Sequence, residues 1–131
     1  MKKAALIVLF IAILVTNCLK EDEPVLCHLY GWAKSESDST IGINNLILQI
    51  RDINPYNINY LRIRETNTRN EDSVAGFFEM DSVCYGLTNQ QGTGFVTIKV
   101  DSMQNPACST QYWAPTIVGA VDTIILYVIP K

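Results

Sequence analysis

The 131-residue sequence predicts an all-β protein: an antiparallel β-sandwich of six to seven strands, preceded by an N-terminal signal helix. Three observations favour this fold class. After the N-terminal apolar run, no segment of twelve or more residues keeps the periodicity of an amphipathic helix. Short segments instead alternate apolar and polar residues with a period of two. Clusters of Gly, Pro, Asn and Ser separate these segments, as is typical of a sandwich.

The N-terminal segment has the three parts of a secretory signal. Two lysines precede an unbroken apolar run from Ala4 to Val15, and a polar, charged stretch follows it. The apolar run is only about half of the roughly 20 residues that a helix needs to cross a bilayer. We therefore expect the chain to be exported. The expected parts are a signal peptide, a tether and a β-sandwich domain, at residues 1–17, 18–24 and 25–131.

The segment Val15-Thr16-Asn17-Cys18 resembles the lipobox of bacterial lipoproteins. In that family the cysteine becomes the mature N-terminus and its thiol receives a diacylglycerol, so the resemblance implies lipidation at Cys18. Asn17 stands where Gly, Ala or Ser is usual. A lipid on Cys18 would anchor the protein to a membrane at the periplasmic or extracellular face of the cell envelope. The alternatives are cleavage by ordinary signal peptidase and a retained signal.

The exported part of the chain is acidic. From Cys18 onward it holds eight Lys and Arg against thirteen Asp and Glu, a net charge of −5. This sign argues against nucleic acid as a partner, because nucleic-acid binding needs a clustered basic face. Four arginines lie near one another but alternate with acidic residues, which indicates a solvated strand surface. These are Arg51, Arg62, Arg64 and Arg69.

The first two expected strands are separated by turn signals. Val25 to Trp32 is the first strand, and it ends at the polar stretch Lys34 to Thr40. Leu46 to Arg51 alternates apolar and polar residues, which predicts a strand with one buried face. Asn54-Pro55-Tyr56-Asn57 predicts the next turn, because Pro and Asn both favour turns.

The third expected strand, Tyr60 to Thr66, carries charge on alternate positions. Its pattern predicts a half-buried strand in which Leu61 and Ile63 face the core. Arg62 and Arg64 would then face water. This orientation is the simplest one for a strand that mixes aliphatic and charged residues.

Three more strands are expected, at Gly76–Met80, Phe95–Val100 and Asp122–Ile129. Polar, Gly-rich or Pro-containing connections come before or between them, at residues 67–73, 85–94 and 103–115. The last strand is nearly all apolar and rich in β-branched residues. We therefore expect it in the interior of the sheet.

The cysteines point to one disulfide rather than to a metal site. With Cys18 assigned to the lipid, three cysteines remain in a compartment that permits disulfides. Cys84 and Cys108 lie near segment ends and are the favoured pair. Cys27 lies in an apolar run, where we expect it to pack as a small buried hydrophobe. Because no Cys-x-x-Cys and no pair of histidines is present, the sequence predicts no metal site.

Four segments, in this order, resemble elements of the carboxypeptidase regulatory-like domain, a transthyretin-like β-sandwich of exported bacterial proteins. They are Gly31-Trp32-Ala33, Ile43-Asn44-Asn45-Leu46-Ile47-Leu48, Glu65-Thr66-Asn67-Thr68 and Ser73-Val74-Ala75-Gly76-Phe77-Phe78-Glu79. Ala75 replaces the acidic residue that the family has before its glycine, and the stretch from Asn89 to Gly94 is longer than the family's loop. The resemblance implies a binding, accessory or spacer module without catalytic activity.

Two polar groups are candidates for chemistry. His28 is the only histidine and has no nucleophile and acid beside it in the sequence, so a hydrogen-bonded structural role is favoured over catalysis. Asn70-Glu71-Asp72 together with Asp81 offers oxygens for calcium, but the irregular spacing favours an ordinary acidic loop. The sequence thus predicts a protein that is not an enzyme and holds no cofactor.

Two further features bear on ligand binding. A polar stretch with three glycines resembles a phosphate-binding loop, but no helix follows it, so a hairpin loop is favoured. These are Gly86, Gly92 and Gly94. Four aromatic residues could form a platform for a sugar or a peptide, or could instead hold long loops onto the sandwich. These are Tyr56, Tyr85, Tyr112 and Trp113.

Together these features predict an exported, lipid-anchored, non-catalytic β-sandwich protein with a binding or accessory role in the cell envelope. An envelope protein is the expected macromolecular partner, since an exposed sheet edge can accept a partner strand. The small-molecule ligand is left open. The alternatives are a structural spacer without a ligand and a small secreted enzyme.

Overall fold

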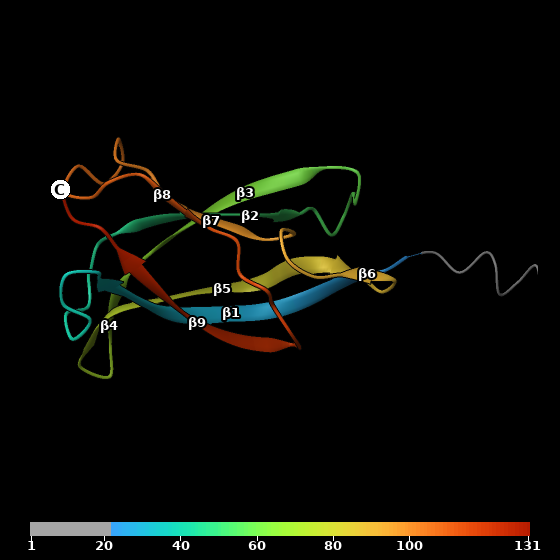
Figure 1. Cartoon of the computed structure of the whole chain (residues 1–131). Coiled ribbons are helices and arrows are strands. Elements are labelled where there is room, and N and C mark those ends of the chain that lie inside the picture. Colours follow the sequence, from blue (N-terminus) through green and yellow to red (C-terminus); the bar gives the residue numbers. More distant parts are fainter. Residues whose placement is uncertain (1–21) are drawn as a thin grey trace, which may run out of the picture.

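The computed structural model describes residues 22–131, which form nine strands in two sheets and contain no helix (Figure 1). The all-β prediction is confirmed for these residues, and none of them belongs to a helix able to cross a membrane. The predicted signal peptide and Cys18 lie outside the described part of the chain. The end of the predicted tether belongs to the folded body. Thr88 N–H donates to the Glu23 carbonyl (2.9 Å), and Pro24 begins the first strand.

One sheet has five strands and contains both the first and the last strand of the described residues. Its path runs β4, β5, β1, β9, and β6 pairs with β5. The strands are β1 (Pro24–Ser35), β4 (Arg69–Glu71), β5 (Val74–Leu87), β6 (Gln90–Gln91) and β9 (Val121–Val128). β1 and β9 are parallel, with His28 opposite Val121 and Ser35 opposite Val128. The other strand pairs of this sheet are antiparallel.

The second sheet has four antiparallel strands in the order β3, β2, β7, β8. They are β2 (Ile47–Ile53), β3 (Leu61–Asn67), β7 (Thr97–Val100) and β8 (Gln111–Trp113). Figure 1 shows this sheet above the five-stranded one, with the described N-terminal end near β6 and the C-terminus at the opposite end.

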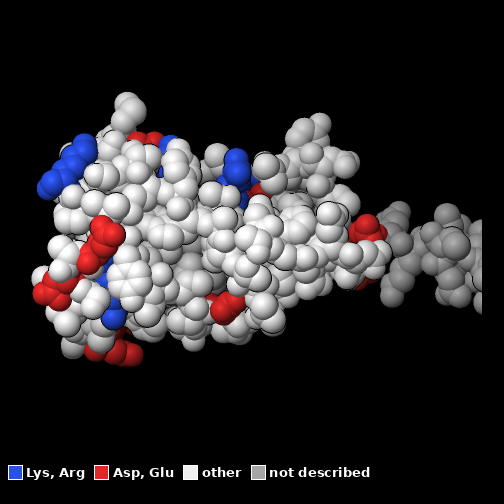
Figure 2. Space-filling model, in the orientation of Figure 1, with Lys and Arg blue, Asp and Glu red and all other residues white. Residues whose placement is uncertain are grey.

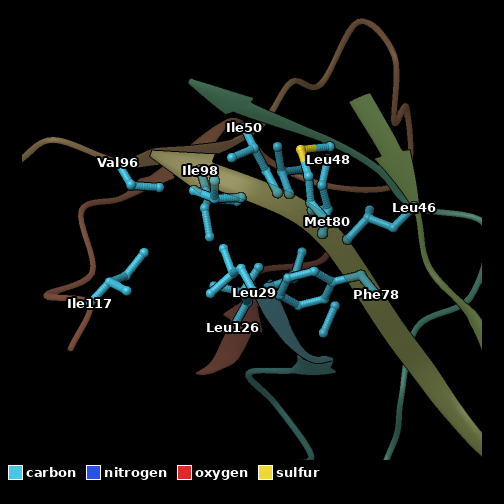
Figure 3. Packing of buried hydrophobic residues seen from close by; sticks show 14 of the residues in the cluster. Leu29, Leu46, Leu48, Ile50, Phe78, Met80, Val96, Ile98, Ile117 and Leu126 are labelled. Atoms are coloured by element: carbon cyan, nitrogen blue, oxygen red, sulfur yellow. The ribbon is translucent and has the colours of Figure 1, made fainter. Parts of the chain in front are cut away.

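The two sheets share one hydrophobic core (Figure 3). Alternation along the strands builds it: Leu48 and Ile50 of β2 are fully buried, whereas Gln49 and Arg51 at the alternate positions are not. The other sheet, with the loop before β9, contributes Leu29, Phe78, Met80, Ile117 and Leu126. Each fully buried Leu, Ile or Phe side chain stabilises the fold by about 1.5–3 kcal/mol.

Strand number and direction differ from the sequence prediction. Nine strands replace the expected six to seven, because β4, β6 and β8 lie inside segments predicted as connections. These strands have only two or three residues, which is too short for a periodic pattern to show. The prediction of a wholly antiparallel fold is also wrong, because β1 and β9 are parallel.

The last strand, β9, lies at a sheet edge and not in the interior. Within residues 22–131, β1 is the only strand that pairs with it. Ile125 and Tyr127 on its outer face are 46% and 47% exposed. Apolar and β-branched residues also favour half-buried strands, so composition alone does not place a strand inside a sheet.

The two faces of β3 are the reverse of the prediction. Leu61 and Ile63 are 60% and 63% exposed, while Arg62 and Arg64 turn toward the opposite sheet. The cause is Asp52 of β2, whose side chain is fully buried and needs positive partners. A buried carboxylate thus decides which side of β3 faces inward.

Asp52 joins the two sheets through a dense set of hydrogen bonds. Arg62 donates to both carboxylate oxygens from Nε and Nη2, each at 2.9 Å, and the Cys84 N–H donates to Oδ2 at 2.7 Å. Arg62 also donates to the Ser82 carbonyl of β5, and Arg64 to the Asp81 carbonyl. The bonds to Asp52 raise the pKa of Arg62, whereas burial lowers the pKa of Arg64. We call Asp52, Arg62 and Arg64, together with the backbone groups of β5 that they bond, the Asp52 clamp.

β1 and β9 approach closely because Gly31 has no side chain. A Cβ at this position would lie 1.9 Å from the carbonyl oxygen of Ile124 on β9. Real Cβ atoms do not come so close to another heavy atom, so any larger residue must push the two strands apart. The close parallel pairing of β1 with β9 therefore requires glycine at position 31.

Candidate functional site

The strongest candidate site is a shallow hollow of about 270 Å³ on the outer face of the four-stranded sheet. Side chains from all four strands line it. They are Gln49 and Arg51 of β2, Ile63 of β3, Thr97 and Lys99 of β7, and Tyr112 of β8.

The strand register explains why these six side chains meet. Arg51 lies opposite Ile63 on one side and Thr97 on the other. Lys99 lies opposite both Gln49 and Tyr112. Residues directly opposite each other in paired strands point to the same face of the sheet. The alternate residues of β2 and β7 fill the core, so the polar residues between them must face outward.

Lys99 is held in place by neighbours on both sides. Its Nζ lies 2.6 Å from Asp101 Oδ2 and 5.6 Å from the centre of the Tyr112 ring. The hydrogen bond between Lys99 and Asp101 raises the pKa of Lys99 and lowers the pKa of Asp101. The cation–π contact orients the ring at the wall of the hollow. Lys99 therefore contributes a charge that Asp101 partly offsets.

Arg51, by contrast, has no acidic partner. Among residues 22–131 it forms no salt bridge, and its one side-chain hydrogen bond is a long one of 3.5 Å from Nη2 to Thr97 Oγ1. A guanidinium presents five N–H donors in a planar fork. Most of these donors are therefore free to meet a ligand in the hollow.

Gln49 is oriented by a side-chain network at the rim. Its Nε2 donates to Glu65 Oε1 (3.3 Å) and to Gln104 Oε1 (3.0 Å), and Gln104 Nε2 donates to the same Glu65 oxygen (2.8 Å). Donation from Gln104 and then from Gln49 lowers the pKa of Glu65. Both bonds use the Gln49 amide nitrogen, so its side-chain carbonyl oxygen stays available as an acceptor.

Comparison of the chain with protein-family models, curated proteins and solved structures finds no match. The resemblances to bacterial lipoproteins and to the carboxypeptidase regulatory-like domain therefore stay predictions. The hollow brings side chains from all four strands of one sheet to an outward-facing cavity, which is the usual form of a binding site.

The predicted aromatic platform is not assembled. Tyr85 is buried and Trp113 packs against the core, because each points to the inner face of its sheet. Tyr56 is exposed in the turn between β2 and β3. Of the four predicted residues, only Tyr112 lines the hollow, where it is 64% exposed.

A different aromatic cluster covers the outer face of the five-stranded sheet. Tyr30 and Trp32 of β1 pack against Phe77 of β5, with ring centres 6.3 and 5.7 Å away. The Arg69 guanidinium covers Phe77 at 5.0 Å and pairs with Glu79 at 2.6 Å. The spacing of Tyr30 and Trp32 could have predicted this cluster, since residues two apart in a strand share a face. The members of the cluster contact one another, which indicates a structural role.

His28 lies beside this cluster and between two acids. Its Nε2 is 3.3 Å from Glu79 and its Nδ1 is 3.4 Å from Asp81. Arg69 is the main cause of the lowered pKa of Glu79, and the Ser82 backbone N–H is the main cause of the lowered pKa of Asp81, with His28 adding to both. No hydrogen bond joins His28 to a hydroxyl or thiol side chain in the described part of the chain.

The proposed calcium ligands do not converge. The side chain of Asn70 bonds Asn44, Glu71 pairs with Arg69, and Asp81 lies beside His28. Across residues 22–131, no three His, Cys, Asp or Glu side chains gather closely enough to hold a metal ion.

The glycine-rich stretch forms part of a hairpin, as predicted. Gly86 of β5 lies opposite Gln91 of β6, so the chain turns back between these two strands. Gly92 and Gly94 follow β6 with positive φ angles, and strand β7 comes next in the chain. This stretch therefore does not open a helix that could bind phosphate.

Cys84 and Cys108 are free thiols in the structure, so the predicted disulfide between them is absent. Cys84 lies opposite Leu26 near the start of β1, whereas Cys108 bridges Pro130 just beyond the end of β9. These places are at opposite ends of the five-stranded sheet, far beyond the roughly 7 Å between Cα atoms that a disulfide can span. Cys27 is buried in the core as expected, and burial raises the pKa of its thiol.

Proposed function

We propose that this chain is an exported, non-catalytic β-sandwich protein of the cell envelope, of the carboxypeptidase regulatory-like kind. In this proposal a lipid at Cys18 tethers it to a membrane, and the hollow binds a ligand. One observation carries the proposal: a cavity on an exposed sheet face gathers six side chains, including an arginine without an acidic partner among the described residues. Exposure to water explains why polar residues lie on this face. It does not explain why several hydrogen-bond donors converge on one cavity.

The position of the N-terminal end supports a tethered arrangement. Asp22 follows Cys18 by four residues, and a chain of that length spans at most about 14 Å. Lipidation at Cys18 would hold the β6 end of the domain near the membrane (Figure 1). The outer faces of both sheets would remain accessible from the side. Figure 2 shows that Lys and Arg lie at separate places on the face drawn there, without forming a continuous basic surface.

The tether is tested by labelling cells with radioactive palmitate. We expect label on the native protein and none on the Cys18→Ala variant, because the thiol is the only site to which the diacylglycerol is attached in this proposal. The protein level of both variants, measured by immunoblot, serves as the control. Equal label on the two proteins would contradict the lipid tether and leave the hollow unaffected.

The hollow is tested by binding of the full-length protein, solubilised in detergent, to purified envelope polysaccharide and peptidoglycan. We expect Tyr112→Ala to weaken binding about tenfold, because truncation of an important aromatic contact residue commonly costs more than about 1 kcal/mol and about 1.4 kcal/mol is tenfold in affinity. Glu71→Gln, on the other sheet, is the matched control and should bind like the native chain. Lack of binding by the native chain, or equal binding by Tyr112→Ala, would favour the spacer alternative.

A further inference from the structure

We infer that the ligand of the hollow is a carboxylate-bearing sugar, presented by an acidic polysaccharide. This inference rests on the proposed function, which makes the hollow a binding site. It adds the chemical class of the ligand, and it comes from the charge, the shape and the hydrogen-bonding groups of the six lining residues.

The charge of the hollow is opposite to the charge of the chain. From Cys18 onward, acidic residues outnumber basic ones by thirteen to eight, yet the lining has two cations and no carboxylate. Asp101 offsets Lys99, whereas Arg51 lacks such a partner among the described residues. A local positive site on an acidic protein attracts an anionic group.

Arg51 is the cation of the lining that has no acidic partner among the described residues. Its planar guanidinium fork matches the paired oxygens of a carboxylate or a phosphate, with two parallel N–H···O bonds. A carboxylate carries a single negative charge, which one such cation balances, whereas a phosphate monoester carries about −1.5 to −2. Arg51 lies in the middle of the sheet face, between Ile63 and Thr97, so a carboxylate bound there would place the rest of its molecule inside the hollow. Lys99, already paired, would act as a second and weaker attraction.

The remaining lining fits one sugar ring. Gln49, Thr97 and Tyr112 supply amide and hydroxyl groups for ring hydroxyls, and Ile63 and the Tyr112 ring supply apolar surface for its C–H groups. The volume of about 270 Å³ lies just below the range of pockets for drug-sized molecules, which begins near 300 Å³. Because the hollow lies on the outer face of the sheet and is not an enclosed cavity, the sugar can belong to a long polymer.

The test compares two polymers with the same sugar backbone: polygalacturonate, whose carboxylates are ionised, and its methyl ester, whose carboxyl groups are neutral. The full-length protein in detergent is titrated with each. We expect the free acid to bind at least about tenfold more tightly than the ester, as one charge-assisted hydrogen bond implies. Arg51→Gln should remove this preference, and Arg51→Lys should restore only part of it, because Lys lacks the planar fork. Arg69→Gln on the opposite sheet is the control and should keep the preference.

The outcomes separate this inference from the proposed function. Equal binding of acid and ester, lost in Tyr112→Ala, would overturn the carboxylate inference and keep the hollow as a binding site. A preference for the acid that survives Arg51→Gln would also overturn it, because general charge attraction would then explain the preference. Lack of binding to both polymers also overturns the carboxylate inference. Whether the hollow is a binding site is then decided separately, by the binding of purified envelope polysaccharide and peptidoglycan described above.

Discussion

Replacing Asp52 with Asn is expected to lower the free energy of unfolding by about 3–5 kcal/mol, the cost of removing one partner from a buried ion pair. The Asp52 side chain is fully buried and accepts bonds from Arg62, Arg64 and the Cys84 N–H. An amide keeps the shape but leaves two guanidinium groups without their counter-charge. It also turns an NH₂ group toward donors that need an acceptor. Urea unfolding followed by tryptophan fluorescence measures the loss.

The control for this prediction is Glu71→Gln. Glu71 pairs with Arg69 at 3.5 Å, and both side chains are nearly half exposed, so the change should cost less than about 1 kcal/mol. If Asp52→Asn costs no more than Glu71→Gln, the Asp52 clamp does not stabilise the joint between the sheets. Arg62→Gln provides a second check, because its effect should not add to that of Asp52→Asn.

Gly31→Ala is expected to cost about 3 kcal/mol or more, at or above the upper end of ordinary overpacking. The new Cβ would lie 1.9 Å from the Ile124 carbonyl oxygen and 2.8 Å from its carbon, and both are backbone atoms that cannot rotate away. Strands β1 and β9 would have to separate along the ladder that joins them. Hydrogen exchange of the β9 amides, together with urea unfolding, measures the effect.

Gly119→Ala is a suitable comparison for Gly31→Ala. Gly119 has a φ of 87°, but a Cβ added there would meet only open space, so only backbone strain of about 1–2 kcal/mol is expected. Amide exchange in the middle of β9 should remain slow in this variant. If Gly31→Ala lowers the free energy of unfolding less than Gly119→Ala does, β1 and β9 can move apart easily. That result would contradict the requirement for glycine at position 31.

The extent to which local pattern predicts this fold is clearest in β2 and β3. The alternation in β2 correctly places Leu48 and Ile50 in the core, because local hydrophobicity is enough to decide its faces. In β3 the same reasoning fails. Arg62 and Arg64 turn inward to a carboxylate on another strand and to carbonyls of β5, and no local pattern contains that information. The parallel position of β9 is likewise a long-range result.

Of the candidate site, the sequence predicts only Tyr112. Gln49, Arg51 and Lys99 are outward-facing residues of strands that the sequence does predict. They meet because β2 pairs with β7 although β3 to β6 come between them in the chain, and alternation within a strand does not reveal that pairing. These strands do carry polar side chains at every second position. That pattern marks a solvent-facing side but does not identify the strand beside it.

The pairing of β1 with β9 has a consequence for the timing of folding. Because the first and last strands are neighbours, the five-stranded sheet has high contact order and cannot be completed until the C-terminal residues are available. Bringing β1 and β9 together closes a long loop. The chain loses this conformational entropy before the contacts between the two strands can stabilise the sheet. We therefore expect β1 to lack one of its two neighbouring strands until β9 has been synthesised.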